Sequence, residues 1–327
     1  MDVFCCLPGR PNTQLSAGKA WLLWHNRPRS GHIQPEMPPK DKPARRAKQD
    51  TCQPEPKLPV SSSTPPEFAA EQAHLFRVVL ESMNRRHIPF VVSGAFALRM
   101  HTGICRDTKD LDLFLPAESA SAALRELAQD GFETEISDPA WLAKAHRNGF
   151  YVDLITGMSN GVFSVDQSWI ERGISADIMG VPVRVLAAEE LFASKLFVTR
   201  RERFDGADLC HIIYGTKGKL DWKRVLELTG DAHWELVLWA IVLFDYAYPA
   251  HRHYVPRMIW DVLLHRLRHS FNHPSLPARF RGSLIDPKMF AIDVEDWGMD
   301  DLCEEYRAQR KSIVAYGLDA AGKSPAA

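Results

Sequence analysis

Two aspartates, Asp110 and Asp112, stand one residue apart in an apolar run, and this spacing constrains the fold more than any other feature. Leu111 and Leu113 alternate with the acidic residues, a pattern typical of a β-strand. Side chains two residues apart in a strand point to the same face, so both carboxylates project together. Because neighbouring like charges repel, we expect a cation between them, and a divalent cation that prefers oxygen ligands is the natural partner.

A glycine turn precedes this strand, and a third aspartate follows it. A short apolar run ends in Ser93, Gly94 and Ala95. A strand, a glycine and then a helix bring backbone N–H groups to a helix N-terminus, which suits phosphate, although the same turn is also a common structural joint. Asp153 is the only charge in the apolar run 150–155. A buried charge needs a partner or a metal, so three carboxylates converge if the two strands are neighbours.

The order of the expected elements predicts an α/β (α+β) fold with a mixed sheet, followed by an all-helical unit. Strands and helices alternate up to the hairpin expected at 175–186, whereas helical patterns dominate afterwards. The later helices are expected at 188–203, 206–214, 221–229, 232–246 and 255–268. The first 66 residues hold 12 of the 22 prolines and too few regularly spaced apolar residues to offset the entropy of ordering. We therefore expect a disordered Pro-rich arm (1–66), a catalytic α/β domain (67–186), a helical domain (187–312) and a flexible tail (313–327).

Composition excludes some classes of protein. The formal net charge is −1 and 45% of the residues are hydrophobic, which is normal for a globular protein without a bulk basic field for nucleic acid. The longest apolar run, Leu236 to Phe244, is too short to cross a membrane. The cysteines are scattered, as in reduced cytosolic proteins. We expect a cytoplasmic protein with no membrane partner.

The glycine and the three aspartates together resemble the nucleotidyltransferase superfamily related to DNA polymerase beta. The family pattern is an apolar strand, Gly-Gly or Gly-Ser, a spacer, Asp-x-Asp and a later third Asp. Arg106 and Thr108 before the pair resemble the AbiEii toxin-like branch, and so does a later segment, Glu189-Glu190-Leu191 leading to Lys195, Arg201, Arg203, Asp205 and Asp208. The C-terminal stretch, with Arg281-Gly282-Ser283-Leu284 and Asp296-Trp297-Gly298, resembles uncharacterised bacterial nucleotidyltransferases. The resemblance covers roughly residues 75–300.

This resemblance implies a reaction and a set of site residues. Asp110 and Asp112 would bind two catalytic Mg²⁺ ions, for which Mn²⁺ can substitute. Asp153 would bind one of them and act as the general base toward a hydroxyl acceptor. That hydroxyl attacks the α-phosphate of an NTP such as ATP or GTP, and pyrophosphate leaves. The implied nucleotide-binding residues are Ser93, Gly94, Ala95, Arg106, Thr108, Lys195 and Arg201.

Several alternatives remain open at this point. Ala95 stands where the family has Gly or Ser, which favours a non-catalytic nucleotide-binding sensor or scaffold as the alternative function. The AbiEii resemblance suggests a toxin that acts on tRNA and has an antitoxin protein as partner. The acceptor is otherwise an RNA end, a protein or a small molecule. For Asp205 and Asp208, a helix-capping box is the simpler interpretation than a metal site.

Overall fold

The computed structural model describes residues 68–273, 278–310 and 313, and all of them belong to one compact unit, Leu58–Ala327. The predictions for residues 1–66, and those for the tail beyond Ile313, lie outside the described residues. The boundary near residue 186 stays a prediction. None of the described helices is long and apolar enough to cross a membrane.

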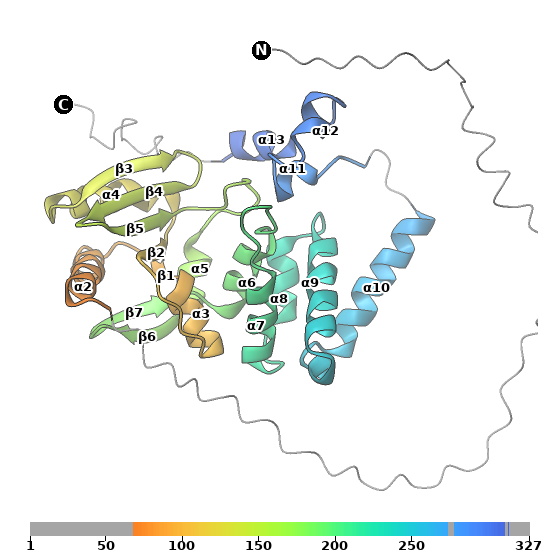
Figure 1. Cartoon of the computed structure of the whole chain (residues 1–327), viewed down its shortest axis with the longest axis horizontal. Coiled ribbons are helices and arrows are strands. Elements are labelled where there is room, and N and C mark those ends of the chain that lie inside the picture. Colours follow the sequence, from red (N-terminus) through yellow and green to blue (C-terminus); the bar gives the residue numbers. More distant parts are fainter. Residues whose placement is uncertain (1–67, 274–277, 311–312, 314–327) are drawn as a thin grey trace, which may run out of the picture. The chain divides into compact units, whose positions relative to one another are not determined.

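Seven strands form one mixed sheet in the order β3-β4-β5-β2-β1-β7-β6 (Figure 1). The β2–β5 and β1–β7 pairs are parallel, and the other neighbouring pairs are antiparallel. The chain is thus an α/β protein with a mixed sheet, as its pattern of elements predicts. The strands are β1 (Val91–Val92), β2 (Asp110–Phe114), β3 (Glu133–Asp138), β4 (Leu142–Arg147), β5 (Phe150–Ile155), β6 (Ile174–Ile178) and β7 (Val181–Val185).

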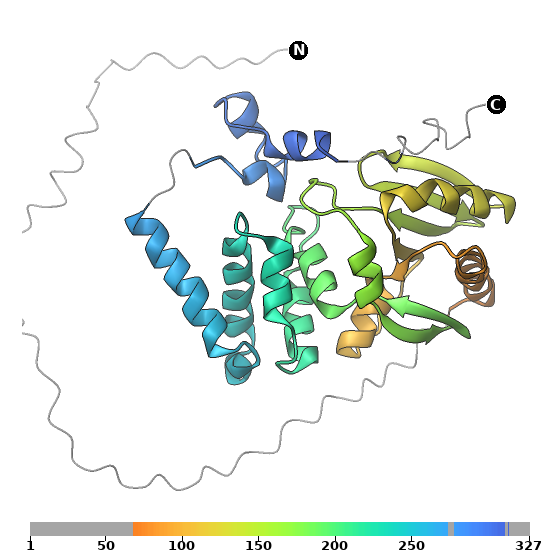
Figure 2. The same ribbon diagram turned by 180° about the vertical axis from the view of Figure 1, so that it is seen from behind.

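Helices cover the sheet because its strands alternate apolar and polar side chains. Leu111 and Leu113 of β2 are fully buried. Helices α2 (Ala70–Arg85) and α4 (Ala117–Gln129) contact each other and the strands, with α4 against β3 and β4 (Figure 2). The alternate residues of β2 face the other way, and Phe114 stacks on Trp169 of α5 (Gln167–Arg172). The aspartates of β2 therefore lie on the face opposite the buried leucines.

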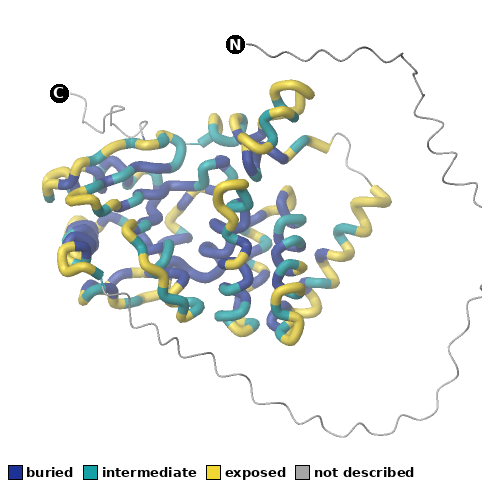
Figure 3. Tube along the Cα trace, in the orientation of Figure 1, coloured by how far each residue is buried: buried dark blue, intermediate teal, exposed yellow. Residues whose placement is uncertain are grey.

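The part of the chain after β7 is helical. Helix α6 (Ala188–Leu196) is buried along its whole length at the centre of the described unit (Figure 3), whereas much of α10 is exposed. Helix α7 contacts both α6 and α3 (Gly94–Thr102), so the helical part packs directly on the element that follows β1. The further elements are α7 (Gly206–Thr216), α8 (Trp222–Thr229), α9 (Trp234–Ala247), the 3₁₀-helix η1 (Pro249–Tyr254), α10 (Arg257–Asn272), α11 (Gly282–Ile285), α12 (Ala291–Glu295) and α13 (Leu302–Ala308).

Two local expectations differ from the structure. The helix predicted over 188–203 ends at Leu196, because the chain then reverses in a turn closed by a bridge between Thr199 and Phe204. The β-branched Val198 and Thr199 disfavour continuation of a helix. Strand β4 was not predicted at all, since its alternating residues Ala143 and Ala145 are small and poor strand formers.

Candidate active site

The three aspartates lie on adjacent strands. Asp112 of β2 is directly opposite Asp153 of β5 in the parallel register, and Asp110 is opposite Tyr151. Residues opposite each other on neighbouring strands place their side chains on the same face, and Asp110 shares that face because it is two residues away. The two strands are therefore neighbours, which is the condition on which the convergence of the three carboxylates depends. The metal-binding and catalytic roles of the aspartates stay predictions.

The glycine turn adjoins this carboxylate cluster. The backbone N–H of Ser93 donates to the carbonyl oxygen of Asp112 at 2.8 Å. Gly94, the first residue of α3, has φ +57°, and a Cβ at this position would lie 1.8 Å from Oδ2 of Asp112. Glycine is required here both for the left-handed backbone and for the space that the carboxylate fills. Ala95 follows in the first turn of α3, where N–H groups lack partners within the helix.

Burial and, after it, mutual repulsion raise the pKa values of the aspartates in the cluster. Burial, followed by the charges of Asp153 and Asp110, raises the pKa of Asp112 to about 6. Burial and the charge of Asp153 also raise the pKa of Asp110. The nearby cations only partly offset this: Arg203 and Lys195 lower the pKa of Asp112 without cancelling the shift. The cluster therefore carries more negative charge than its surroundings neutralise.

Lys195 reaches the site from α6, but two carboxylates hold its ammonium group. Its Nζ lies 2.7 Å from Oδ2 of Asp208 and 2.9 Å from Oδ2 of Asp205. Its buried position, 9% exposed, explains why these partners are needed. The same charge influences Asp112, so Lys195 borders the aspartate cluster. Its predicted contact with a triphosphate stays a prediction.

Arg106 joins the same network through Asp208. Its guanidinium donates two hydrogen bonds to the Asp208 carboxylate, one of them 3.1 Å long from Nη1 to Oδ2. Burial raises the pKa of Asp208, but the His211 ring, whose Nδ1 lies 3.9 Å from Oδ1, and the bonds from Arg106 and Lys195 outweigh burial and hold that pKa well below its usual range. Arg106 thus ties the loop before β2 to helix α7, and its predicted nucleotide contact stays a prediction.

Thr108 braces the entry into β2. Its Oγ1 donates to the carbonyl oxygen of Asp110 at 2.8 Å and accepts the Asp110 N–H at 3.2 Å. Gln72 of α2 donates to the Thr108 carbonyl at 2.7 Å. These bonds fix the backbone on which Asp110 is carried, so Thr108 positions a carboxylate in this structure.

The capping box expected at the start of α7 is wrong. Asp205 occupies the N-cap position, but its side chain makes no capping hydrogen bond. The carboxylate instead accepts from Lys195 at 2.9 Å and from Arg203 at 3.2 Å. A buried ammonium group is a stronger partner for the carboxylate than a neutral amide, and Asp208 is likewise drawn to Lys195.

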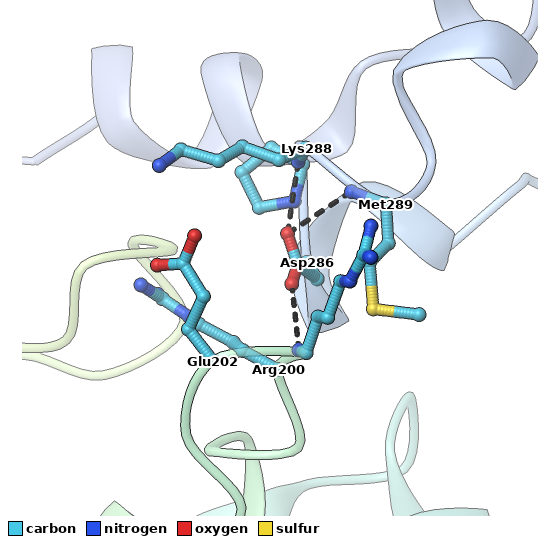
Figure 4. A pocket seen from close by; sticks show the side chains of 7 residues that line it. Arg200, Glu202, Asp286, Lys288 and Met289 are labelled. Carbon is cyan, nitrogen blue, oxygen red and sulfur yellow. Dashed lines mark hydrogen bonds between the residues drawn. The ribbon is translucent and has the colours of Figure 1, made fainter.

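Arg201 lies apart from the aspartates. Its backbone N–H donates to Oδ2 of the buried Asp286 at 3.2 Å, and its side chain lines a cavity of about 290 Å³ (Figure 4). Asp286 sits at the centre of this cavity and also accepts the N–H groups of Lys288 and Met289. None of the three aspartates lines the cavity, and the predicted contact of Arg201 with a nucleotide stays a prediction.

Lys144 of β4 is the residue of this site that the sequence interpretation missed. It is directly opposite Asp153 in the antiparallel β4–β5 register, and its Nζ lies 2.7 Å from Oδ1 of Asp153. A usable signal was present: Asn148-Gly149 is a typical two-residue hairpin turn. Both residues have positive φ, 53° and 81°.

The donor chemistry of the cluster fits a divalent cation. Asp110 and Asp112 offer only oxygen donors, which Mg²⁺ and Mn²⁺ prefer, and their pKa values are raised by burial and by the neighbouring carboxylates. Within residues 68–273, 278–310 and 313, however, no three acidic, His or Cys side chains surround a common point in the manner of a metal site. Asp153 is paired with Lys144 in this structure. Asp110 and Asp112 are the residues that would hold a metal.

Known proteins provide an independent comparison. Residues 72–230 match the model of a family described as "Nucleotidyl transferase of unknown function (DUF2204)". No curated protein sequence matches the chain significantly.

Solved structures of low similarity also align with the chain. The antibiotic-resistance factor ANT(2'')-Ia is 17% identical, with a TM-score of 0.37 over 57% of this chain and 98% of that chain. An antigenic nucleotidyltransferase-like protein from Paracoccidioides brasiliensis is 16% identical, with a TM-score of 0.37 over 57% of this chain and 93% of that chain. At such TM-scores no conclusion about chemistry follows.

The matched segment includes the features that carry the sequence resemblance. It contains the glycine turn, the three aspartates and Lys195. The closer resemblance to the AbiEii branch stays a prediction. Residues 72–230 of this chain belong to the nucleotidyltransferase superfamily.

Proposed function

We propose that the chain is a metal-dependent enzyme that transfers a nucleoside monophosphate from an NTP to a hydroxyl acceptor and releases pyrophosphate. One observation carries the proposal: Asp112 and Asp153 are directly opposite on parallel strands, with Asp110 two residues away, beside a turn that only glycine can form. A cluster of carboxylates next to a helix N-terminus needs cations to admit a triphosphate.

Each residue has a definite task in this proposal. Asp110 and Asp112 hold the divalent metal, which when bound offsets the charge of the triphosphate. The backbone N–H groups at the start of α3 receive the β- and γ-phosphates. Asp153 accepts the proton of the acceptor hydroxyl. The hydroxyl oxygen forms the new bond to the α-phosphorus as the bond from that phosphorus to pyrophosphate breaks.

The pairing with Lys144 affects how Asp153 performs this task. Lys144 engages Oδ1, so Oδ2 is the oxygen that would receive the proton. An ion pair also fixes the orientation of a carboxylate, which favours a general base that must be in hydrogen-bonding reach of its substrate. The role proposed for Asp153 is therefore compatible with the ion pair.

The decisive test compares product formation by matched variants. Wild-type protein, the double variant Asp110→Asn/Asp112→Asn and the control Asp107→Asn, an exposed aspartate just before the site, are incubated with Mg²⁺ and α-labelled NTPs. Cellular RNA, total protein and small hydroxyl compounds serve as acceptor pools. We expect label transfer and pyrophosphate release from the wild type and from Asp107→Asn only. Equal turnover by the double variant would refute the proposal.

The same assay separates the alternative function. Nucleotide binding without label transfer to any acceptor pool would favour the sensor or scaffold, for which Ala95 is the motivating residue. Mass spectrometry of the labelled pool identifies the acceptor class, because an added nucleoside monophosphate gives a fixed mass increase on RNA, protein or a small molecule.

A further inference from the structure

A row of polar residues crosses four adjacent strands through the candidate site. Glu135 of β3 is opposite Lys144 of β4, Lys144 is opposite Asp153 of β5, and Asp153 is opposite Asp112 of β2. Directly opposite residues share a face of the sheet. Lys144 therefore stands between a carboxylate on the outer strand and the carboxylate cluster.

Lys144 pairs with the inner of these two carboxylates. Its Nζ bonds Oδ1 of Asp153 at 2.7 Å, whereas Glu135 accepts a hydrogen bond from Ser137 at 2.8 Å. The inner position is electrostatically preferred, because Asp110 and Asp112 add their negative charge to that of Asp153. The side chains of Lys144 and Asp153 are 28% and 18% exposed, so the pair is partly shielded from solvent. Lys144 also acts beyond its partner, since its charge lowers the pKa of Asp110 against the larger effect of burial.

The other cations near the cluster are shared with acidic groups of their own. Lys195 is held by Asp205 and Asp208, and Arg203 is paired with Asp205. Lys144 is the cation that bonds directly to one of the three aspartates in the described part of the chain. The three carboxylates carry three negative charges, and Lys144 offsets one, so the two that remain match one divalent ion.

We propose that Lys144 is a built-in counterion that takes the place of one of the two divalent metals expected at the site. The nucleotide-free protein then binds a single divalent cation, held by Asp110 and Asp112, while Lys144 keeps Asp153 in position. A metal ion at Asp153 would have to displace the ammonium group from Oδ1. This inference rests on the proposed function, because it assumes that Asp110 and Asp112 bind metal.

The test counts bound ions and does not depend on activity. Mn²⁺ is titrated into nucleotide-free protein, and electron paramagnetic resonance measures the free ion. The variant Lys144→Met removes the charge and keeps the apolar stem, Lys144→Arg keeps the charge, and Lys109→Met is the matched control. Lys109 is exposed and also lowers the pKa of Asp110, whereas the ion pair with Asp153 is made by Lys144.

We expect one Mn²⁺ per chain for the wild type, Lys144→Arg and Lys109→Met, and two for Lys144→Met. Thermal melting of each variant in the absence of metal confirms that it is folded. A wild type that binds two ions, or a folded Lys144→Met that binds one with wild-type affinity, would overturn the inference while leaving the metal site intact. Failure of the proposed function looks different: Asp110→Asn/Asp112→Asn would then bind Mn²⁺ as the wild type does, or the wild type would bind none.

Discussion

Gly94 and Asp112 approach so closely that a Cβ on residue 94 would lie 1.8 Å from Oδ2 of the aspartate. The turn proposed for phosphate and the carboxylate proposed for metal thus fill adjoining space. A side chain at position 94 must move Asp112, and Asp112 is tied to the sheet because its carbonyl oxygen accepts the N–H of Ser93. The glycine and the carboxylate form one structural unit.

Gly94→Ala is therefore expected to abolish metal binding and also to weaken the fold. The left-handed backbone alone costs about 1–2 kcal/mol for a residue with a Cβ, and the clash adds the displacement of a carboxylate. We expect Mn²⁺ affinity to fall at least tenfold, measured by titration of the folded variant.

Gly103 provides the matched control at the other end of α3. It also has positive φ, +74°, but a Cβ there would meet nothing within 4 Å. Gly103→Ala should lose only the stability that backbone strain costs, about 1–2 kcal/mol in urea denaturation, and retain wild-type Mn²⁺ affinity. If both variants lost the metal equally, backbone strain and not contact with Asp112 would explain the effect.

Asp112→Asn should stabilise the protein above about pH 6. The pKa of Asp112 is raised from 3.8 to about 6 in the fold, so the folded state binds its proton more tightly than the unfolded state. Its contribution to stability is present at low pH and is lost as pH rises through this window. Removing the charge should therefore raise the free energy of unfolding at pH 7.5 by about 2 kcal/mol, after allowance for partial exposure.

Urea denaturation at pH 4 and pH 7.5 measures this difference. The gain from Asp112→Asn should be much smaller at pH 4, where Asp112 is protonated in the folded state and only partly ionised in the unfolded state. The exposed control Asp107→Asn should change stability by less than about 0.5 kcal/mol at either pH. A loss of stability in Asp112→Asn at pH 7.5 would contradict the prediction.

The affinity for Mn²⁺ should rise with pH over the same range in which the stability contribution of Asp112 is lost. A divalent cation and a proton compete for Asp112, so a carboxyl with a pKa of about 6 binds metal poorly at pH 5. We expect Mn²⁺ affinity about tenfold lower at pH 5 than at pH 7.5, measured by titration at each pH. The weaker Mn²⁺ binding that remains in Asp112→Asn should not show this drop in affinity between pH 7.5 and pH 5. Affinity that does not change between pH 5 and pH 7.5 would refute the assignment.

The strand that carries Asp110 and Asp112 was predictable because period-two alternation is a local signal. The position of Lys144 could also have been derived. A two-residue turn at Asn148-Gly149 places residues 147 and 150 opposite each other, and counting outward brings Lys144 opposite Asp153, as the observed register shows. The strand was not predicted because the alanines beside Lys144 are poor strand formers, although the turn determines its register.

The partners of Asp208 could not have been predicted in the same way. Arg106 is 102 residues away in sequence, and its contact arises only when α7 packs near the loop before β2. The local pattern at Asp205 and Asp208 indicated a capping box, but Lys195 provides a charge-assisted partner that the local sequence does not reveal. Local propensity was overridden by tertiary electrostatics.

Asp208→Asn should be among the more destabilising single changes in the chain. The carboxylate is 3% exposed and is bonded to Arg106 and Lys195. Without its charge, the buried ammonium group of Lys195 keeps only Asp205. Breaking such a pair costs about 3 kcal/mol, since an uncompensated charge remains in the interior. Urea denaturation at pH 7.5 measures this loss.

Two observations distinguish loss of the Asp208 charge from nonspecific destabilisation. One is a control substitution in a surface ion pair, and the other is the pH dependence of the Asp208→Asn penalty. Asp261 pairs with Arg257 on α10, with the two side chains 67% and 93% exposed, and Asp261→Asn should cost less than about 0.5 kcal/mol.

Because the pKa of Asp208 is lowered in the fold, its contribution to stability is present above the unfolded pKa of 3.8 and declines as pH falls below it. The penalty of Asp208→Asn should therefore be constant from pH 8 to about pH 5 and shrink below about pH 4. That dependence is opposite in sign to that of Asp112→Asn, and a penalty that stayed unchanged at low pH would show that packing, rather than charge, is what Asp208 contributes.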